Sequence, residues 1–112
     1  MRIAAVDFLG VNVTPKTNWA FLLVRTDCGR TGIGECTLAN QEALLDAEAA
    51  RLAANVVGED ALNRNRLARL IPHAPGGLVA HSVLSAFEQA LWDLAGQQAG
   101  RDYGLTAASY IL

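Results

Sequence analysis

The chain has few of the residues that cross-linking and catalytic chemistry use most often. Its 112 residues include two cysteines, two histidines and a single lysine, Lys16. A disulfide framework needs more cysteines, and a zinc site needs more ligands at fixed spacings. We therefore expect Cys28 and Cys36 to be free thiols. A Pro-Gly-Gly turn lies between His73 and His81, which argues against a shared metal site.

A strong net charge and a long apolar run are also missing. The formal net charge is -2 and the pI is about 5.5, so there is no basic field to attract nucleic acid or an anionic membrane. No run of about 18 apolar residues could span a bilayer. The first residues alternate, whereas a signal peptide has a continuous apolar core. The sequence predicts no nucleic-acid partner, no membrane partner and a cytoplasmic location.

No complete set of catalytic side chains can be recognised in the sequence. Glu88 and Asp93 are five residues apart, so on a helix they point to different sides and form no carboxylate cluster for Mg²⁺. The glycines of residues 29–34 precede a predicted strand, whereas a phosphate cradle opens a helix. Ser82 and Ser85 have no partner base within reach in the sequence. We therefore predict no catalytic residue and no metal ligand in this chain.

The first third of the sequence has the pattern of an antiparallel meander. Strands are predicted over residues 3–13, 19–26 and 31–38. Pro15 interrupts the first pair, and an Asp-Cys-Gly turn joins the second and third strands. Gly32 and Gly34 indicate a bulge or a close approach of another backbone. On the first strand, one face is expected to carry Ile3, Leu9, Val11 and Val13, and the other Val6 and Phe8.

The rest of the sequence has the periodicity of helices. Asn40 is predicted to cap the first helix, which Gly58 ends, and Asp60 to cap a shorter second helix, which Pro72 ends. A third helix is predicted over residues 79–99, with Gly100 as its end. The apolar faces comprise Leu45, Ala49, Leu52 and Val56, then Leu62, Leu67 and Leu70, then Val79, Val83, Phe87, Leu91 and Leu94. Strands followed by helices predict an α+β fold, a three-stranded antiparallel meander sheet followed by a three-helix bundle.

Three motifs in this order resemble one known family. They are a TDCG turn leading to Gly32-Ile33-Gly34-Glu35, a helix ending in VVGED at residues 56–60, and SAFEQALWDLAG at residues 85–96. Together they resemble the N-terminal capping domain of the enolase superfamily, in its mandelate racemase and muconate lactonizing enzyme branch. The resemblance covers residues 1–102. Residues 103–112 depart from the family pattern and are predicted to be a divergent C-terminal tail.

The resemblance implies chemistry that would lie outside this chain. In the family the cap is followed by a modified (β/α)₇β barrel, where a base removes the proton α to a carboxylate and Mg²⁺ stabilises the enediolate. The parent protein would then be an isomerase or lyase: a sugar-acid dehydratase, a racemase or a cycloisomerase. Mg²⁺ and a carboxylate or sugar-acid substrate are implied only for a parent with a barrel domain. This chain alone is expected to hold no cofactor and to be inactive.

The resemblance also implies where the cap would meet substrate. Two loops of the family's cap close over the barrel mouth, and here they correspond to residues 14–18 and to about residues 37–41. The predicted substrate-binding residues are Lys16, Thr17, Asn18, Trp19 and Thr37. An ordinary turn explains the Pro-Lys-Thr-Asn sequence equally well, and Trp19 could instead be a strand residue packed on the helices.

The alternative to a capping domain is a stand-alone, self-associating interaction module or a truncated gene product without catalysis. A cap without its barrel would leave apolar helix and loop surface uncovered, so a homo-oligomer is expected.

The Trp92-Asp93 pair in the last motif is interpreted as structural. Trp92 is expected at the edge of the apolar stripe, packed on the sheet, where truncation to alanine would cost about 3 kcal/mol. Asp93 is expected to face solvent or to pair locally with an arginine or a backbone N–H group.

Overall fold

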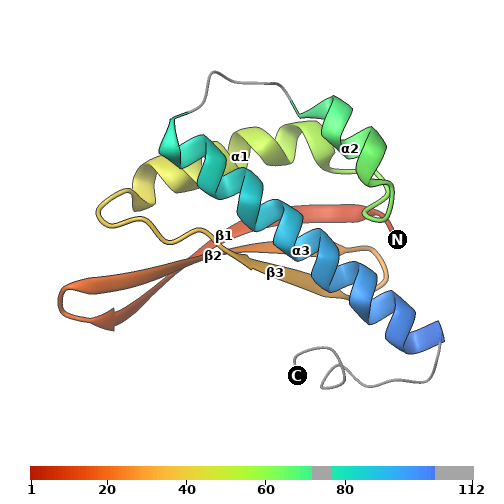
Figure 1. The fold of residues 1–112 in the computed structure, drawn as a ribbon, viewed down its shortest axis with the longest axis horizontal. Helices are drawn as coiled ribbons and strands as arrows, with labels where there is room; N and C mark the ends of the chain where they lie inside the picture. Colours follow the sequence, from red (N-terminus) through yellow and green to blue (C-terminus); the bar gives the residue numbers. More distant parts are fainter. Residues whose placement is uncertain (72–76, 103–112) are drawn as a thin grey trace.

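Three antiparallel strands come first in the chain and three helices follow (Figure 1). This computed structural model describes residues 1–71 and 77–102. The strands are β1 (Ile3–Thr14), β2 (Thr17–Thr26) and β3 (Thr31–Glu35), in the sheet order β1-β2-β3. The helices are α1 (Glu42–Val56), α2 (Arg64–Leu70) and α3 (Leu78–Asp102). The predicted α+β class and antiparallel meander are confirmed. The predicted tail of residues 103–112 and the predicted helix end at Pro72 lie outside the described residues.

The hairpin of β1 and β2 is longer than the rest of the sheet. β1 pairs with β2 over almost its whole length, from Ile3 opposite Thr26 to Thr14 opposite Thr17. β3 pairs only with the stretch of β2 from Phe21 to Arg25. Residues 10–20 therefore form a two-stranded projection, which we call the arm. Figure 1 shows the arm extending past the helices at one end of the molecule.

The helices cover one face of the sheet and bury the core against it. α1 packs on β1, and α3 packs on β3 and β2. From β2 the core receives Ala20, Leu22 and Val24, from α1 Leu45, Ala49, Leu52 and Val56, and from α3 Val83, Phe87, Leu91 and Leu94. The predicted apolar face of α1 is confirmed, as is that of α3 except for Val79, which is only half-buried. On α2, Leu67 is buried but Leu62, predicted for the same face, is exposed and precedes the helix.

A register shift near the start of β1 changes which side chains face the core. The shift lies between Ile3 and Ala5 and returns Ile3 to the side of the sheet that Val6 occupies. Ile3 is 1% exposed, while Leu9 and Val11 lie on the uncovered face. The prediction that placed Ile3 with Leu9 and Val11 was therefore wrong, because strict alternation along a strand fails where one residue is inserted into a ladder.

The two glycines of β3 allow α3 to lie directly on the sheet. A Cβ atom at Gly32 would be 2.8 Å from the Leu94 side chain, and one at Gly34 would be 2.6 Å from the carbonyl carbon of Ala86. The β2–β3 register runs without a shift across both positions. Of the two alternatives, the close backbone approach is confirmed and the bulge is not present.

The ends of the helices differ from the predictions. Asn40 has a φ of 59°, and α1 begins after Gln41 without a side-chain cap, so the predicted Asn40 cap was wrong. α2 is capped by Asn63, whose side chain accepts from the Arg66 N–H, and not by Asp60. α3 continues through Gly100, which was predicted to end it. A glycine weakens a helix without ending it where the neighbouring turns stay hydrogen-bonded.

Candidate functional site

The polar residues predicted for the first loop lie at the tip of the arm and along it. Pro15 and Lys16 form the turn, in which the Lys16 N–H donates to Thr14 Oγ1 over 3.3 Å. Thr17 is the first residue of β2, and the side chains of both Lys16 and Thr17 are exposed. A two-residue connection between antiparallel strands leaves such side chains facing solvent, where a cation can meet an approaching anion.

Asn18 joins the arm to the first turn of α1. Its Oδ1 accepts from Asn12 Nδ2 over 2.8 Å, across the hairpin. Its Nδ2 donates to Glu42 Oε1 over 3.2 Å. Neither partner could be recognised from the sequence. The Asn12 contact depends on a second register shift, between Asn12 and Thr14, and the Glu42 contact depends on where α1 lies in space.

Thr37 joins the base of the arm to the segment that follows β3. Its Oγ1 accepts from the Ala20 N–H over 3.0 Å and donates to Glu35 Oε2 over 2.8 Å. The Cys36 N–H also donates to the Ala20 carbonyl over 2.9 Å. The two predicted loop regions therefore lie together at one end of the molecule, as Figure 1 shows.

Trp19 lies on the uncovered face of the sheet. It is a β2 residue opposite Val11 and is 47% exposed. Because side chains alternate along a strand and Ala20 faces the core, Trp19 faces away from the helices. The alternative that packed Trp19 on the helices is therefore wrong, and its ring is accessible beside the tip of the arm.

A polar hollow of about 300 Å³ lies where the end of β3 meets the second turn of α3. It is lined by Glu35, Cys36, Thr37, His81, Ser82 and Ser85. Hydroxyl and imidazole groups both donate and accept hydrogen bonds, so this lining could bind a polar ligand. A larger, mainly apolar groove of about 490 Å³ lies between the helices and contains Leu52, Phe87 and Leu91.

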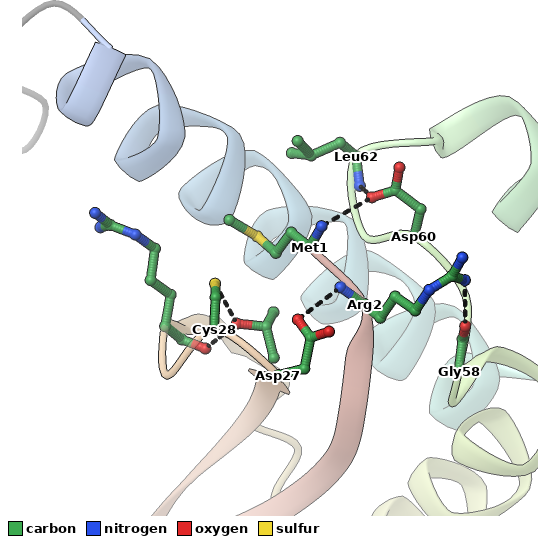
Figure 2. Close-up of polar contacts among 9 residues, drawn as sticks. Met1, Arg2, Asp27, Cys28, Gly58, Asp60 and Leu62 are labelled. Carbon is green, nitrogen blue, oxygen red and sulfur yellow. Dashed lines mark hydrogen bonds and ion pairs between the residues drawn. The ribbon is translucent and has the colours of Figure 1, made fainter.

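The two thiols differ in their surroundings. Cys28 lies in the exposed β2–β3 turn, where the hydrogen bond with the Thr26 hydroxyl lowers the pKa of its thiol. Burial raises the pKa of the Cys36 thiol to about 11. Figure 2 shows Asp27, the neighbour of Cys28 in this turn, beside Arg2, whose backbone N–H donates to Asp27 Oδ1 and whose guanidinium donates to the Gly58 carbonyl. The Cys28 turn is thus part of the connection between the N-terminus and the end of α1.

The part of the chain that the structure describes contains neither a cluster of metal ligands nor a helix that could span a membrane. No group of three or more histidine, cysteine, aspartate or glutamate side chains in residues 1–71 and 77–102 could hold a metal ion. Within the same ranges, no helix is both long and apolar enough to cross a membrane. His73 lies outside the described residues.

Asp93 accepts a hydrogen bond from the backbone of β3, an edge strand of the sheet. Its Oδ2 accepts from the Ile33 N–H over 3.0 Å, and Gln89 Oε1 accepts from the Glu35 N–H over 3.1 Å. Gln97 Nε2 donates to the Thr31 carbonyl over 3.0 Å. Side chains of α3 therefore bind the backbone groups that an edge strand would otherwise leave unpaired. Asp93 does pair with a backbone N–H, but the prediction of a local partner was wrong, because the donor is Ile33 on β3, 60 residues away in the sequence.

Trp92, the neighbour of Asp93, does not pack on the sheet. Its side chain is 63% exposed, and Arg64 of α2 lies over its ring with the guanidinium carbon 3.7 Å from the ring centroid. The predicted packing was wrong, because one residue along a helix turns the side chain by about 100° and Leu91 occupies the inward position.

The exposure of Trp92 leads to a prediction for its truncation. Replacing Trp92 with alanine should lower the free energy of unfolding by less than about 1 kcal/mol, the size of an exposed cation–π contact. Leu91→Ala, one residue away but buried, should cost about 2–5 kcal/mol. Urea unfolding followed by circular dichroism measures both. A loss near 3 kcal/mol for Trp92→Ala would place the indole in the core.

Comparison with known proteins identifies relatives of this arrangement. The family described as mandelate racemase/muconate lactonizing enzyme, N-terminal domain, matches residues 8–102. The D-galactonate dehydratase of Xanthomonas euvesicatoria pv. vesicatoria (strain 85-10) is 36% identical over 85 residues, which cover 73% of this chain and 22% of the dehydratase. The chain thus spans about a fifth of the length of the dehydratases it matches.

Solved structures share the fold. An enolase of Agrobacterium radiobacter, suggested to be a galactarate dehydratase and solved with sodium and L-malate, has a TM-score of 0.76 and 26% identity, covering 89% of this chain and 26% of its own. A suggested mandelate racemase/muconate lactonizing enzyme from Labrenzia alexandrii DFL-11 has a TM-score of 0.75 and 30% identity, covering 89% of this chain and 28% of its own.

Proposed function

The chain belongs to the mandelate racemase/muconate lactonizing enzyme N-terminal domain family of the enolase superfamily, and we propose that it is the substrate-capping domain of a sugar-acid dehydratase. One observation carries the proposal: at one end of the domain the arm is hydrogen-bonded both to Thr37, in the segment after β3, and to Glu42, at the start of α1. A surface built from two loops can cover a substrate held by another domain. The similarity to D-galactonate dehydratases supports a hydroxylated carboxylate as that substrate.

The arm offers a cation and an aromatic ring to such a substrate. Lys16, the only lysine of the chain, is exposed at the tip and would attract the carboxylate. Trp19 offers an apolar surface on which the carbon chain of the acid can lie. Thr17, Asn18 and Thr37 complete the proposed substrate-binding surface.

The reaction itself is proposed to take place outside this chain. Mg²⁺ would stabilise the enediolate formed when the proton α to the carboxylate is removed. No group of three or more possible metal ligands occurs among the described residues, and we assign none of them to Mg²⁺. The role of this chain is to hold the substrate and exclude water, and alone it should show no turnover. The cytoplasmic location stays a prediction.

The capping function can be tested in a chimera. Residues 1–102 replace the matching N-terminal region of the Xanthomonas D-galactonate dehydratase, and kinetics are measured with D-galactonate. Lys16→Ala and Trp19→Ala should each raise KM about three- to thirtyfold, because each removes about 0.7–2 kcal/mol of substrate contact. Arg69→Ala and Trp92→Ala are the matched controls, since both lie on the helices and both side chains are exposed. Unchanged kinetics for both arm variants would contradict the proposal.

A second candidate function is self-association. Leu9, Val11, Trp19 and Ile33 are exposed large apolar side chains on the uncovered face of the sheet. Such a patch is typical of an interaction surface and would account for a homo-oligomer. Light scattering over a series of concentrations tests this candidate, because a monomer at every concentration would contradict self-association.

A further inference from the structure

The arm receives little support from the rest of the sheet. β3 pairs with β2 only as far as Phe21, so residues 10–20 form a ladder of two strands. An isolated two-stranded hairpin is marginally stable in water. The direction of the arm relative to the helices must therefore depend on side-chain contacts at its base.

The first contact is a chain of three side chains. Asn12 donates to Asn18, and Asn18 donates to Glu42 in the first turn of α1. The carbonyl oxygen and one amide hydrogen of Asn18 are thereby used within the protein. Because Glu42 belongs to a helix that is anchored in the core by Leu45, this chain connects the arm to a rigid element.

The second contact is made by Thr37. A hydroxyl has one hydrogen to donate, and that of Thr37 is directed to Glu35 Oε2. The same oxygen accepts from the Ala20 N–H, which faces outward from β2 at the point where β3 ends. Thr37 thus binds the first backbone donor of the arm that has no strand partner.

We infer that Asn18 and Thr37 are positioning residues that hold the arm over the segment after β3, and that Lys16 and Trp19 are the arm residues that meet substrate. The inference deepens the proposed capping function and rests on it. The predicted substrate-binding residues thus fall into two groups, according to whether their hydrogen-bonding groups are used within the protein or are exposed to solvent. Asn18 and Thr37 use theirs internally, whereas the Lys16 and Trp19 side chains are exposed at and beside the tip.

Amide hydrogen exchange in this chain tests the Asn18 contact. Asn18→Ala and Glu42→Ala should each speed exchange of the arm amides about two- to tenfold, as expected for loss of one hydrogen bond from a local opening equilibrium. Glu42→Gln keeps a carbonyl acceptor for Asn18, so the exchange rates of the arm amides should stay within about twofold of those in the parent. Asn18→Asp places a carboxylate against that of Glu42, so the arm amides should exchange faster in this variant than in Asn18→Ala. Lys16→Ala, on the same arm, should leave exchange unchanged.

Thr37 is tested in the same way. Thr37→Val removes the hydroxyl at nearly constant shape and should speed exchange of the Ala20 amide about two- to tenfold. Thr37→Ser keeps the hydroxyl and should restore the parent rate. The urea midpoint of the whole domain should stay unchanged in the Asn18 and Glu42 variants, since their contacts are exposed.

Two outcomes would overturn the inference: exchange of the arm in Asn18→Ala equal to the parent, or an effect of Glu42→Gln as large as that of Glu42→Ala. Amide exchange does not depend on catalysis, so the capping proposal and the positioning inference can be contradicted independently of each other. Altered arm exchange together with unchanged chimera kinetics for Lys16→Ala and Trp19→Ala would contradict capping and leave the positioning role in place.

Discussion

Replacing Gly34 with alanine is expected to lower the free energy of unfolding by more than about 4 kcal/mol, or to prevent folding. The new Cβ would overlap the carbonyl oxygen of Ala86 and lie 2.6 Å from its carbonyl carbon and 2.8 Å from its Cα. These atoms are helix backbone, which cannot rotate away as a side chain can. Relief would require α3 to move off the sheet, and the hydrogen bonds from Ile33 to Asp93 and from Glu35 to Gln89 would then be lost.

Gly10→Ala is the matched control for this substitution. Gly10 is also a strand glycine, but a Cβ there meets only Phe8 Cε1 at 3.7 Å, an ordinary van der Waals contact. Its unfolding free energy should stay within about 1 kcal/mol of the parent. Urea unfolding followed by circular dichroism measures both variants. Equal stability of Gly34→Ala and Gly10→Ala would mean that α3 does not lie directly on β3.

Truncating Phe87 to alanine is expected to cost about 3–5 kcal/mol, the range for a buried aromatic side chain. Phe87 is 0% exposed and is among the largest fully buried side chains of the core. Its loss removes contacts between α3 and the rest of the core and leaves a cavity that the anchored helices cannot fully close. A domain of ordinary stability, about 5–15 kcal/mol, would lose a large part of its margin.

Phe21→Ala provides the comparison for Phe87→Ala. Phe21 loses the same atoms but is only half-buried, on the uncovered face of the sheet. We expect less than half the cost, measured by the same unfolding experiment. A cost for Phe21→Ala as large as that for Phe87→Ala would show that the uncovered face is buried in solution, which would favour self-association.

Periodic features of the fold could be predicted from the sequence. The α1 face of Leu45, Ala49, Leu52 and Val56 follows helical spacing, and all four residues are buried. Gly32 and Gly34 are two residues apart, so they share one face of a strand and leave room for a backbone along it. Both features depend on regular geometry, which spacing encodes directly.

Features that depend on single irregular residues could not be predicted. No residue type in β1 marks the register shift after Ile3 or the one before Thr14. The first shift nevertheless returns Ile3 to the core, and the second places Asn12 opposite Asn18. A regular two-residue turn at Pro15-Lys16 would have paired Asn18 with Val13 instead. At the helix starts, several polar residues compete, and the observed cap at Asn63 lies three residues after the predicted Asp60.

In the candidate site, too, some features could be predicted from the sequence and others could not. The resemblance to a capping domain located the two loops, and the structure brings them together through Asn18 and Thr37. Glu42 and Glu35, which anchor those contacts, were not recognisable because their role depends on where α1 and β3 lie in space. Trp92 was misplaced because a hydrophobic residue next to a buried stripe cannot be assigned to the core by its type alone.

The ratio of KM values for Trp19→Ala and Trp92→Ala in the dehydratase chimera tests the central claim most directly. Both substitutions remove one exposed tryptophan from the same domain, one beside the tip of the arm and one beneath Arg64 on the helices. If the arm meets substrate, Trp19→Ala should raise the KM for D-galactonate about three- to thirtyfold while Trp92→Ala leaves it unchanged. Equal KM values for the two variants in a folded, active chimera would contradict a capping role for this domain.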